Sequence, residues 1–444
     1  VSPMNTIISL PESAWRVTRR EFFRRLGGTS AAAATFAASF APLKGSPGMS
    51  SSPAQKSETF WRLVKEQFIL REGLILMNAA NLCPSPISVM ETVFGYLRDE
   101  DQDASFQNRA KYAGLLETSR ARLAALMGAS PDEIAMVRNT SEGNNLAVNS
   151  FDLKAGDEVL LWDQNHPTNN VAWRVRAARH GFAVKYVSLP WPPASIEQIL
   201  EAFRKGFTPR TKVLSFSDVS NVSGTALPAA ELCRMAHERG VVVHIDGAQT
   251  FGVKRVNLHE VGCDTYAGSA HKWFVGPKEA GIFYIRKERI PETWPMVVGS
   301  GWGDEVAPAA EGARKFETLG QRNDATLAAV GKACELHSIL GKSSIEMRTR
   351  ELATALKEGI ASIPGARLYT SLDPALSLGV VVFSLGTTVN HEKAYTQLYE
   401  EYGVGGAYFP GAEPKLRLCP HIYNTMAEVE KVVSALHSLA GRSA

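Results

Sequence analysis

Short apolar runs that alternate with helical patterns constrain the fold of this 444-residue chain more than any other feature. Several of the runs are rich in β-branched residues, and segments with helical periodicity separate them. Such an alternation is typical of a mostly parallel sheet that is covered by helices on both faces, so we expect an α/β fold. The predicted strands are 134–137, 158–162, 182–188, 212–217, 241–245, 265–268 and 281–286, and the predicted helices around them are 109–127, 169–180, 196–205 and 229–239.

The chain divides into four predicted regions. Residues 1–48 differ in composition from the rest and form a targeting segment with its linker, and residues 59–105 form an N-terminal arm and small-domain segment. The alternating pattern at 106–315 predicts a large ligand-binding domain. The pattern loosens over 316–444, which predicts a smaller C-terminal α+β domain. The helices expected outside the large domain are 58–71, 325–340, 344–363, 391–401 and 426–439, and the strands are 74–78, 366–369 and 379–384.

An acid and a lysine follow two of the predicted strands. Asp246 comes directly after the run 241–245, and Lys272 lies 26 residues further along, after the next apolar segment. In open α/β sheets, ligands bind outside the carboxyl ends of the strands. A carboxylate there keeps a pyridine nitrogen protonated, and a lysine amine forms an imine with an aldehyde. We therefore expect pyridoxal 5′-phosphate (PLP) as cofactor, with Lys272 as its Schiff-base lysine and Asp246 as its acid partner; a turn-capping acid and a solvated lysine are the structural alternatives.

Three polar residues near these strand ends suit the ring of such a cofactor. His166 follows the strand 158–162, and its flat ring is expected to stack on the pyridine and to help move protons. Asn221, which follows the strand 212–217, and Gln249 are expected to reach the phenolic oxygen. Ordinary loop roles are the alternatives for His166 and Asn221.

The phosphate group of the cofactor needs hydrogen-bond donors at the start of a helix. Thr140 and Ser141 follow a predicted strand and open a helical stretch. Ser269 and His271 flank the lysine and are expected to close the cradle from the other side. A simple helix cap is the alternative for Thr140 and Ser141.

Arg417 is the candidate for binding the substrate. Its planar guanidinium can hold a carboxylate through two parallel hydrogen bonds. We therefore predict that Arg417 binds the carboxylate of the substrate. A surface ion pair is the alternative.

The first fifty residues carry the pattern of a twin-arginine export signal. Arg19 and Arg20 precede two aromatic residues, and a weakly hydrophobic, Ala-rich run at 26–41 follows, ending in a small-residue pattern at Ala41. A Ser/Pro/Gly-rich tract at 45–53 separates this run from the predicted domains. The layout predicts export of the folded protein to the periplasm by the twin-arginine translocation machinery. A basic amphipathic helix is the alternative.

Removal of this signal changes the charge balance. Residues 1–48 carry a net +4, so the formal net charge of +3 becomes −1 for a mature chain that starts near residue 49. The excess of basic residues lies in the signal, so the charge of the mature chain does not indicate a nucleic-acid partner. No strongly apolar stretch reaches the length of about 18 residues that a membrane span requires, so we expect none in the mature protein. The five cysteines form no CxxC pair; we expect buried thiols and no metal site.

Five separated motifs, taken in order, resemble those of the class V aminotransferase family, which contains cysteine desulfurases and isopenicillin N epimerase. The resemblance covers residues 60–440 and implies an aspartate-aminotransferase-like fold, PLP as cofactor and a homodimer with active sites at the subunit interface. Arg417 and the trailing residues 423–425 resemble the family's carboxylate-binding arginine and its Tyr-Asn-Thr. The segment 299–302, with Ser300, resembles the part that reaches the phosphate of the neighbouring subunit. The motifs are Thr-Ser-Glu-Gly at 140–143, His-x-x-x-Asn-x-Val-x-Trp at 166–174 with Asn170 and Trp173 loosely placed, Ser-Asn-Val-x-Gly at 220–224, Asp-Gly-Ala-Gln at 246–249 and Ser-x-His-Lys at 269–272.

One departure from the family pattern bears on the reaction. Cysteine desulfurases carry a loop cysteine before the carboxylate-binding arginine, whereas residues 403–411 contain none and Cys419 comes after Arg417. A persulfide mechanism therefore lacks its nucleophile. The chain is predicted not to be a cysteine desulfurase.

The same motifs combined with an export signal resemble the periplasmic PLP enzymes of pyoverdine maturation. That resemblance implies a peptide-type siderophore precursor as substrate. Its amino-terminal glutamate would be converted to a succinamide by oxidative decarboxylation-type chemistry at the Schiff base of Lys272. An amino-acid epimerase or aminotransferase is the alternative, followed by a PLP-binding protein without catalysis.

Overall fold

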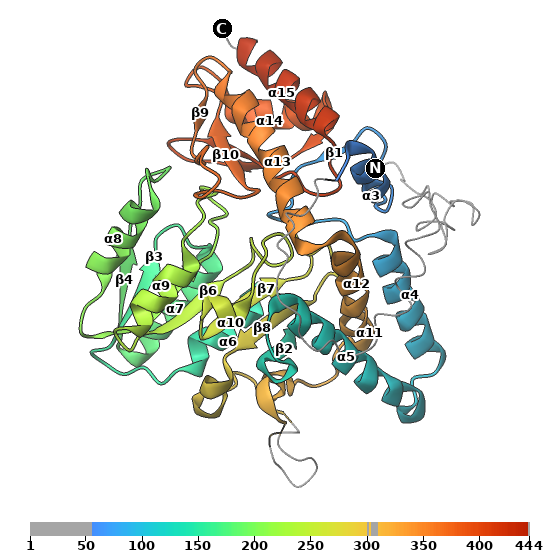
Figure 1. Cartoon of the computed structure of the whole chain (residues 1–444), viewed down its shortest axis with the longest axis vertical. Coiled ribbons are helices and arrows are strands. Elements are labelled where there is room, and N and C mark those ends of the chain that lie inside the picture. Colours follow the sequence, from blue (N-terminus) through green and yellow to red (C-terminus); the bar gives the residue numbers. More distant parts are fainter. Residues whose placement is uncertain (1–55, 300–301, 303–309, 443–444) are drawn as a thin grey trace, which may run out of the picture.

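The computed structural model describes residues 56–299, 302 and 310–442. Figure 1 shows two parts: a large sheet with its helices in the lower half, and a smaller sheet beside the C-terminal helices at the top. The predicted export signal at 1–48 and the predicted phosphate contact Ser300 lie outside the described residues.

A seven-stranded sheet forms the centre of the large part. In space its strands follow the order β2-β8-β7-β6-β5-β3-β4. The strands from β7 through β4 pair in parallel, whereas β8 runs antiparallel to both of its neighbours. This arrangement confirms the predicted α/β fold and places the carboxyl ends of these five parallel strands along one edge. The strands are β2 (Ile134–Val137), β3 (Glu158–Trp162), β4 (Ala183–Val187), β5 (Thr211–Ser217), β6 (Val242–Asp246), β7 (Thr265–Ser269) and β8 (Gly281–Ile285).

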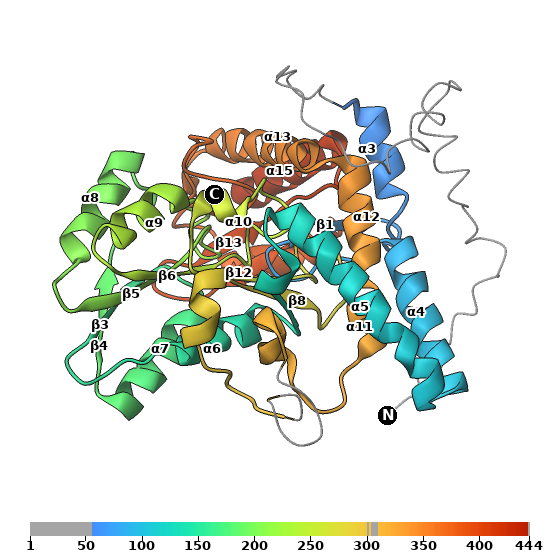
Figure 2. The ribbon, with the colours of Figure 1, turned by 60° about the horizontal axis from the view of Figure 1, so that its bottom comes forward.

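Helices cover both faces of this sheet. Figure 2 shows α6 and α7 below the sheet and α5, α9 and α10 above it. Alternate residues of β3 serve the two faces: Leu160 and Trp162 join one hydrophobic core, while Val159 and Leu161 pack with Trp173 of α7 in another. Strands that are buried on both faces explain why their sequences are continuous apolar runs. The helices are α5 (Phe106–Met127), α6 (Thr140–Ser150), α7 (Pro167–His180), α8 (Ile196–Gly206), α9 (Ala229–His237) and α10 (Leu258–Val261).

A four-stranded antiparallel sheet of order β12-β13-β10-β9 organises the smaller part. Leu356 of α13, Leu436 of α15 and Phe383 of β10 lie in its core. Its strands are β9 (Arg367–Leu368), β10 (Val381–Ser384), β12 (Ala407–Phe409) and β13 (Lys415–Leu418). Its helices are α13 (Lys342–Ala361), α14 (His391–Glu400) and α15 (Met426–Gly441), and α12 (Val330–Leu340) leads into them from the large part.

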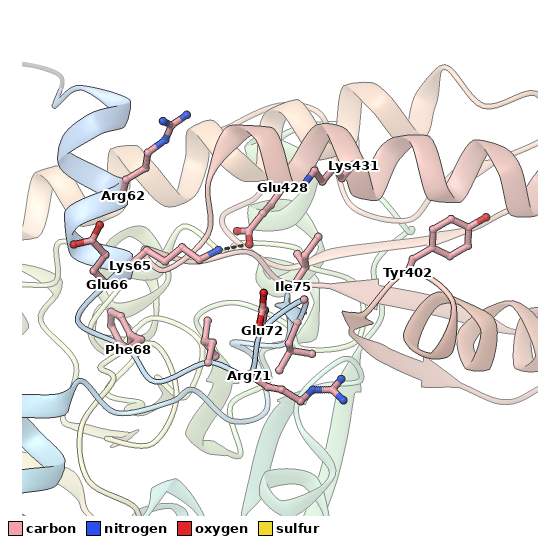
Figure 3. Close-up of a pocket in the computed structure, with 13 residues that line it drawn as sticks. Arg62, Lys65, Glu66, Phe68, Arg71, Glu72, Ile75, Tyr402, Glu428 and Lys431 are labelled. Atoms are coloured by element: carbon pink, nitrogen blue, oxygen red, sulfur yellow. Dashed lines mark hydrogen bonds and ion pairs between the residues drawn. The ribbon is translucent and has the colours of Figure 1, made fainter. Parts of the chain in front are cut away.

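The N-terminal arm ties the two parts together. Helix α3 (Glu58–Lys65) begins after Ser57, whose side chain accepts a hydrogen bond from the amide of Phe60. Lys65 at the end of α3 forms an ion pair with Glu428 of α15, beside a cavity of about 660 Å³ (Figure 3). Further along the arm, β1 (Ile75–Leu76) pairs in parallel with β11 (Val404–Gly405) of the smaller part.

Two predicted helices differ from the structure. The helix expected at 58–71 ends at Lys65, because the chain then turns and Phe68 pairs with Pro86 in an isolated bridge. The helix expected at 325–340 is divided into α11 (Asp324–Ala328) and α12, so its apolar periodicity continues across a break.

Helix α4 (Ile87–Gln102) and the short strands β11 and β12 are among the elements that were not expected. Helix α4 fully buries Val89, and Met90, Val93 and Leu97 are partly buried at helical spacing, so its apolar stripe is present in the sequence and was missed. The glycine-rich segment 403–411 contains the short strands β11 and β12, which form by pairing with β1 and β13. The two short strands depend on tertiary partners and not on local preference.

The five cysteines are buried and unbridged, as expected. In the part of the chain that the structure describes, no helix is long and apolar enough to cross a bilayer. The same residues contain no cluster of histidine, cysteine and carboxylate side chains suited to a metal ion.

Candidate active site

The predicted site residues gather at the carboxyl edge of the large sheet. Asp246 is the last residue of β6, and it pairs with Ser217 at the end of β5. The amide of His166, which follows β3, donates to Ser217 Oγ at 3.4 Å. Lys272 lies in the turn after β7. Four strand ends therefore converge on one place, as expected for an open α/β sheet.

Asp246 is held by two hydrogen bonds and is 2% exposed. Its Oδ1 accepts from the amide of Ala248 at 3.0 Å, and its Oδ2 accepts from Nδ2 of Asn144 at 2.9 Å. Asn144 belongs to α6, so the helix that opens the predicted phosphate cradle also fixes the acid. A carboxylate fixed in this way has a defined direction in which to present its charge.

A chain of hydrogen bonds continues behind Asn144. Because Asn144 donates to Asp246, its Oδ1 accepts, and the donor is His244 Nε2 at 3.1 Å. Nδ1 of the neutral ring is then an acceptor and receives the hydroxyl of Thr265 at 2.9 Å. Burial lowers the pKa of His244 to about 4, which keeps the ring neutral. Asp246 is therefore held, through Asn144, by a buried and uncharged histidine.

This support was missed in the sequence, although two spacings pointed to it. His244 and Asp246 alternate along β6, so their side chains lie on the same face of the strand. Asn144 lies four residues after Thr140, so both lie on the same side of α6. A search for polar residues at these offsets from the predicted site residues would have found both.

The Lys272 amine is prepared for chemistry by its surroundings. Burial lowers its pKa; the charge of Asp246 opposes the shift, and the charge of Arg417 reinforces it. Among the described residues, no hydrogen bond or ion pair holds the amine. A lowered pKa and a free amine are the conditions under which a lysine attacks an aldehyde.

The backbone after Lys272 is clamped from the smaller part of the molecule. The carbonyl of Trp273 accepts from Nε2 of His421 at 2.8 Å, and the carbonyl of Phe274 accepts from Nε2 of His337 at 2.9 Å. Val275, one residue further, has φ 49°, a left-handed conformation that a β-branched residue rarely adopts. These contacts hold a strained turn directly after the reactive lysine.

The predicted phosphate cradle is present in part at the start of α6. Ser269 Oγ accepts from the amide of Thr140 at 2.8 Å and lies 2.7 Å from Thr140 Oγ1. Ser141 is exposed at the same helix start, and His271 is half-buried with its pKa lowered to about 4 by burial. The structure thus brings Thr140 and Ser269 together, and it shows no contact between Ser141 and His271.

His166 caps α7, and its ring is oriented by that role. Nδ1 accepts from the amide of Thr168 at 3.2 Å and lies 2.7 Å from its hydroxyl. Nε2 therefore carries the proton of the neutral ring. Burial lowers the pKa of His166, and the charge of Asp246 opposes this shift. The ring is uncharged and faces the charges of the site, which suits a stacking role.

Gln249 already has protein partners at both ends of its amide. Its Nε2 donates to the carbonyl of Ala80 at 3.0 Å, and its Oε1 accepts from the indole of Trp273 at 2.8 Å. One N–H of this amide remains for a ligand. Gln249 also joins the arm to the lysine turn, a structural role that its place in the motif does not reveal.

Arg417 and Asn221 form the other side of the site. The guanidinium of Arg417, 5% exposed, donates to the carbonyl of Asn221 at 3.0 Å and to Oδ1 of Asn78 at 3.1 Å. Nε of Arg417 and Oδ1 of Asn221 are buried without a partner. Buried polar atoms are normally paired, so these two indicate a place that a ligand completes.

The residues present fit PLP. Asp246 supplies a fixed carboxylate for the ring nitrogen, Lys272 supplies a free amine, and the start of α6 supplies donors for the phosphate. The packing of α6 against the sheet is close, since a Cβ at Gly143 would lie 2.7 Å from the Cβ of Ala267.

Sequence relatives agree with this chemistry. The family model for class-V aminotransferases matches residues 76–432. Isopenicillin N epimerase from Streptomyces clavuligerus is 31% identical over 399 residues, which cover 86% of this chain and 98% of that protein. A cysteine desulfurase from Escherichia coli is 31% identical over 350 residues, which cover 73% of this chain and 83% of that protein.

Solved structures show the same fold. A C-DES mutant with glycine covalently linked to its PLP cofactor superposes with a TM-score of 0.78 at 22% identity, over 84% of this chain and 99% of that chain. The cysteine desulfurase CsdA from Escherichia coli gives a TM-score of 0.77 at 24% identity, over 88% and 100%. Fold, site and sequence thus lead to one conclusion: the chain belongs to the class-V aminotransferase family and is a PLP-dependent enzyme.

Proposed function

We propose that this protein is a periplasmic enzyme that modifies the amino-terminal glutamate of a pyoverdine siderophore precursor. The observation that carries the proposal is the combination of a PLP site around Lys272 with the twin-arginine pattern at Arg19 and Arg20. Membership of the class-V aminotransferase family supports the cofactor chemistry. The sequence resemblance to periplasmic enzymes of pyoverdine maturation supports the substrate and the compartment.

The residues of the site divide the work of such a reaction. PLP, when bound, withdraws electrons from a bond to the carbon that bears the substrate amine. Asp246 keeps a proton on the ring nitrogen, and Lys272, as a free amine, takes up or returns a proton at the reacting carbon. His166 covers the ring and excludes water, and Arg417 holds the substrate carboxylate by paired hydrogen bonds.

The proposed overall reaction is an oxidative decarboxylation. The α-carboxyl group of the glutamate leaves as carbon dioxide, and the carbon that bears the amine takes one oxygen atom from water and becomes an amide carbonyl, which gives the succinamide and releases four protons and four electrons. The carbon is oxidised, so the reaction needs an electron acceptor; molecular oxygen is the first to supply in an assay.

We further propose that the enzyme is not a cysteine desulfurase. Residues 403–411 contain no cysteine. Burial raises the pKa of Cys83 to about 12 and also raises the pKa of Cys419, so neither thiol near Lys272 is readily ionised. Release of sulfide from cysteine at a rate typical of enzymes would contradict this proposal.

An amino-acid epimerase or aminotransferase is the second candidate. The 31% identity to isopenicillin N epimerase over 86% of the chain favours it. Both reactions keep the carboxyl group of the substrate, so carbon balance separates them from the first proposal.

One incubation distinguishes these functions. The PLP-loaded protein is mixed in air with the acylated siderophore precursor or with free amino acids, and the products are analysed by mass spectrometry. Loss of the α-carboxyl carbon from the precursor supports the proposal. Inversion or amine transfer without carbon loss supports the second candidate. A cofactor whose spectrum responds to no amine indicates a PLP-binding protein without catalysis.

The compartment and the assembly have their own tests. Replacing Arg19 and Arg20 by lysine is expected to leave the protein in the cytoplasm, as cell fractionation would show. We also propose a homodimer with shared active sites, which sedimentation of the mature chain would show as twice the monomer mass. A monomer with full activity would contradict shared sites.

A further inference from the structure

A surface of cations and aromatic rings extends outward from Arg417. Lys415 lies two residues before Arg417 on β13, so both side chains leave the same face of the strand. On the neighbouring strand β12, Ala407 pairs with Arg417 and Phe409 pairs with Lys415. The guanidinium of Arg417 lies 5.2 Å from the centre of the Phe409 ring. The buried carboxylate-binding position therefore continues directly into this surface.

The outer part of the surface is built around Tyr369. Lys415 Nζ and the guanidinium of Arg367 each lie 4.7 Å from the centre of the Tyr369 ring. Trp191 meets the same ring edge-on at 6.3 Å, and Lys415 lies 5.4 Å from the centre of the Trp191 ring. We call these residues, Trp191, Arg367, Tyr369, Phe409 and Lys415, the cation–aromatic surface.

The charge of this surface is not balanced by the protein. Among the described residues, the carboxylate that pairs with Arg367 and Lys415 is that of Glu413, at 3.8 Å and 3.9 Å. Glu413 has a side chain that is 60% exposed, so these pairs are weak. With Arg417 at its inner end, the surface carries three cations against one exposed acid. Like charges this close repel one another, so their proximity destabilises the folded protein.

An anionic ligand would resolve this imbalance. Cations beside flat rings attract a flat group that bears a negative charge, because the partly exposed rings of Trp191 and Phe409 can stack on it while the cations offset its charge. Tyr369 is 4% exposed and supports the two outer cations from within the protein. Lys415 and Arg417 are two strand residues apart, a separation of about 7 Å. A ligand whose carboxylate lies on Arg417 would therefore meet Lys415 through a group that extends about this far from its α-carbon.

We propose that the cation–aromatic surface binds the part of the substrate that lies beyond the reacting amino acid, and that it selects a planar aromatic group carrying a negative charge. This inference rests on the proposed function, in which Arg417 holds the carboxylate of the reacting amino acid. The surface makes the enzyme selective for an amino acid extended through its side chain, and free amino acids leave it unused.

Two synthetic amines test the inference. Glutamate γ-anilide carries a neutral aromatic extension, and glutamate γ-(4-carboxyanilide) carries the same ring with a negative charge. Each is titrated into the PLP-loaded protein, and the change in visible absorbance as the amine displaces Lys272 gives its dissociation constant. The wild-type protein is expected to bind the carboxyanilide about fivefold more tightly than the anilide.

Substitutions at the cations should remove this preference. In Lys415→Met the ratio of the two dissociation constants is expected to fall to about one, and Lys415→Arg is expected to restore it in part. Arg367 has a side chain that is 57% exposed, so Arg367→Met tests the same charge without disturbing the packing, with a loss of about half of the preference. Lys205→Met, on an exposed lysine of α8 that is 74% exposed, is the matched control and should keep the ratio.

The possible outcomes test the inference and the proposed function separately. Equal dissociation constants in the wild-type protein, or an unchanged ratio in both Lys415→Met and Arg367→Met, overturn the inference and leave the PLP function intact. No spectral response to either amine overturns the proposed function, and the inference with it. A ratio that falls in the two variants and stays in Lys205→Met supports the inference.

Discussion

The two sides of the active site differ in how completely the protein satisfies its own polar groups. On the side of the ring nitrogen, Asp246 is joined to Asn144, His244 and Thr265 by an unbroken chain of hydrogen bonds. On the substrate side, Oδ1 of Asn221 and Nε of Arg417 are buried without partners. The first side is complete before any ligand binds, whereas the second is completed by its ligands.

The difference suits the chemistry of the family. The ring nitrogen of the cofactor needs the same partner in every turnover. The hydrogen bonds behind Asp246 can therefore hold it rigidly. In the proposed function, the substrate side accepts and releases a carboxylate in each cycle. A buried polar atom without a partner costs about 1–3 kcal/mol, and binding recovers that free energy.

The substitution of Lys272 is expected to have the largest effect. Lys272→Ala should lower turnover by about 10³-fold or more, because the substitution removes both the anchor and the proton carrier. The visible absorbance of the lysine-bound cofactor should disappear in the same variant. Absorbance spectra and product assays check this, and persistence of both signals would rule Lys272 out.

The second largest effect concerns the substrate side of the site. Arg417→Met should raise KM for a carboxylate substrate about a hundredfold, because a buried pair of charge-assisted hydrogen bonds is lost. The value of kcat should fall less, since the lysine and the acid remain in place. Steady-state kinetics with the precursor measure both constants. An unchanged KM would mean that another residue holds the carboxylate.

A matched pair of asparagine variants tests the comparison itself. Asn144→Ala should lower the free energy of unfolding by about 2 kcal/mol, because Asp246 and His244 each lose a buried partner. Asn221→Ala should cost less than about 1 kcal/mol, because the side-chain oxygen that it removes has no partner. Urea denaturation of the protein without added cofactor measures both values. Equal losses would remove the distinction between the two sides.

The last effect is a pH dependence of stability, which is absent at neutral pH and grows as the pH falls. The pKa of His244 is lowered to about 4 in the folded protein from a usual value of 6.5, so the unfolded chain binds the proton first as the pH falls. Its contribution is complete above pH 6.5 and is lost as the pH falls toward 4. His244→Gln should reduce the slope of unfolding free energy against pH in this window by up to about one proton.

His180→Gln, at an exposed histidine of α7, is the matched control for the loss of an imidazole. Denaturation curves recorded between pH 7 and pH 4 give the slopes. A slope that is the same in His244→Gln and in the wild-type protein would show that His244 is not neutral in the fold.

The sequence predicted the large sheet well, because strands buried on both faces need continuous apolar runs that are visible without a structure. Strands 134–137 and 158–162 match β2 and β3 at both ends. Asp246 and Lys272 were predictable for the same reason, since each follows such a run. Helix α4 was missed, although Met90, Val93 and Leu97 stand at helical spacing and are partly buried.

The support of the site was harder to predict than its reactive groups. A reactive group is recognised by its chemistry. Asn144, by contrast, acts through hydrogen bonds to Asp246 and His244, which lie 102 and 100 residues away in the sequence. Val275 is a stronger case, because a β-branched residue gives no hint of a left-handed conformation. Such features follow from packing of distant segments and not from local preference.

The assignment of Lys272 as the residue that binds the cofactor is tested most directly by chemical trapping. The purified protein is loaded with PLP, reduced with borohydride, digested and analysed by mass spectrometry, which locates any lysine that carries the reduced cofactor. The expected result is a single modified peptide with the label on Lys272. A label on another lysine, or no label on any, would contradict the assignment.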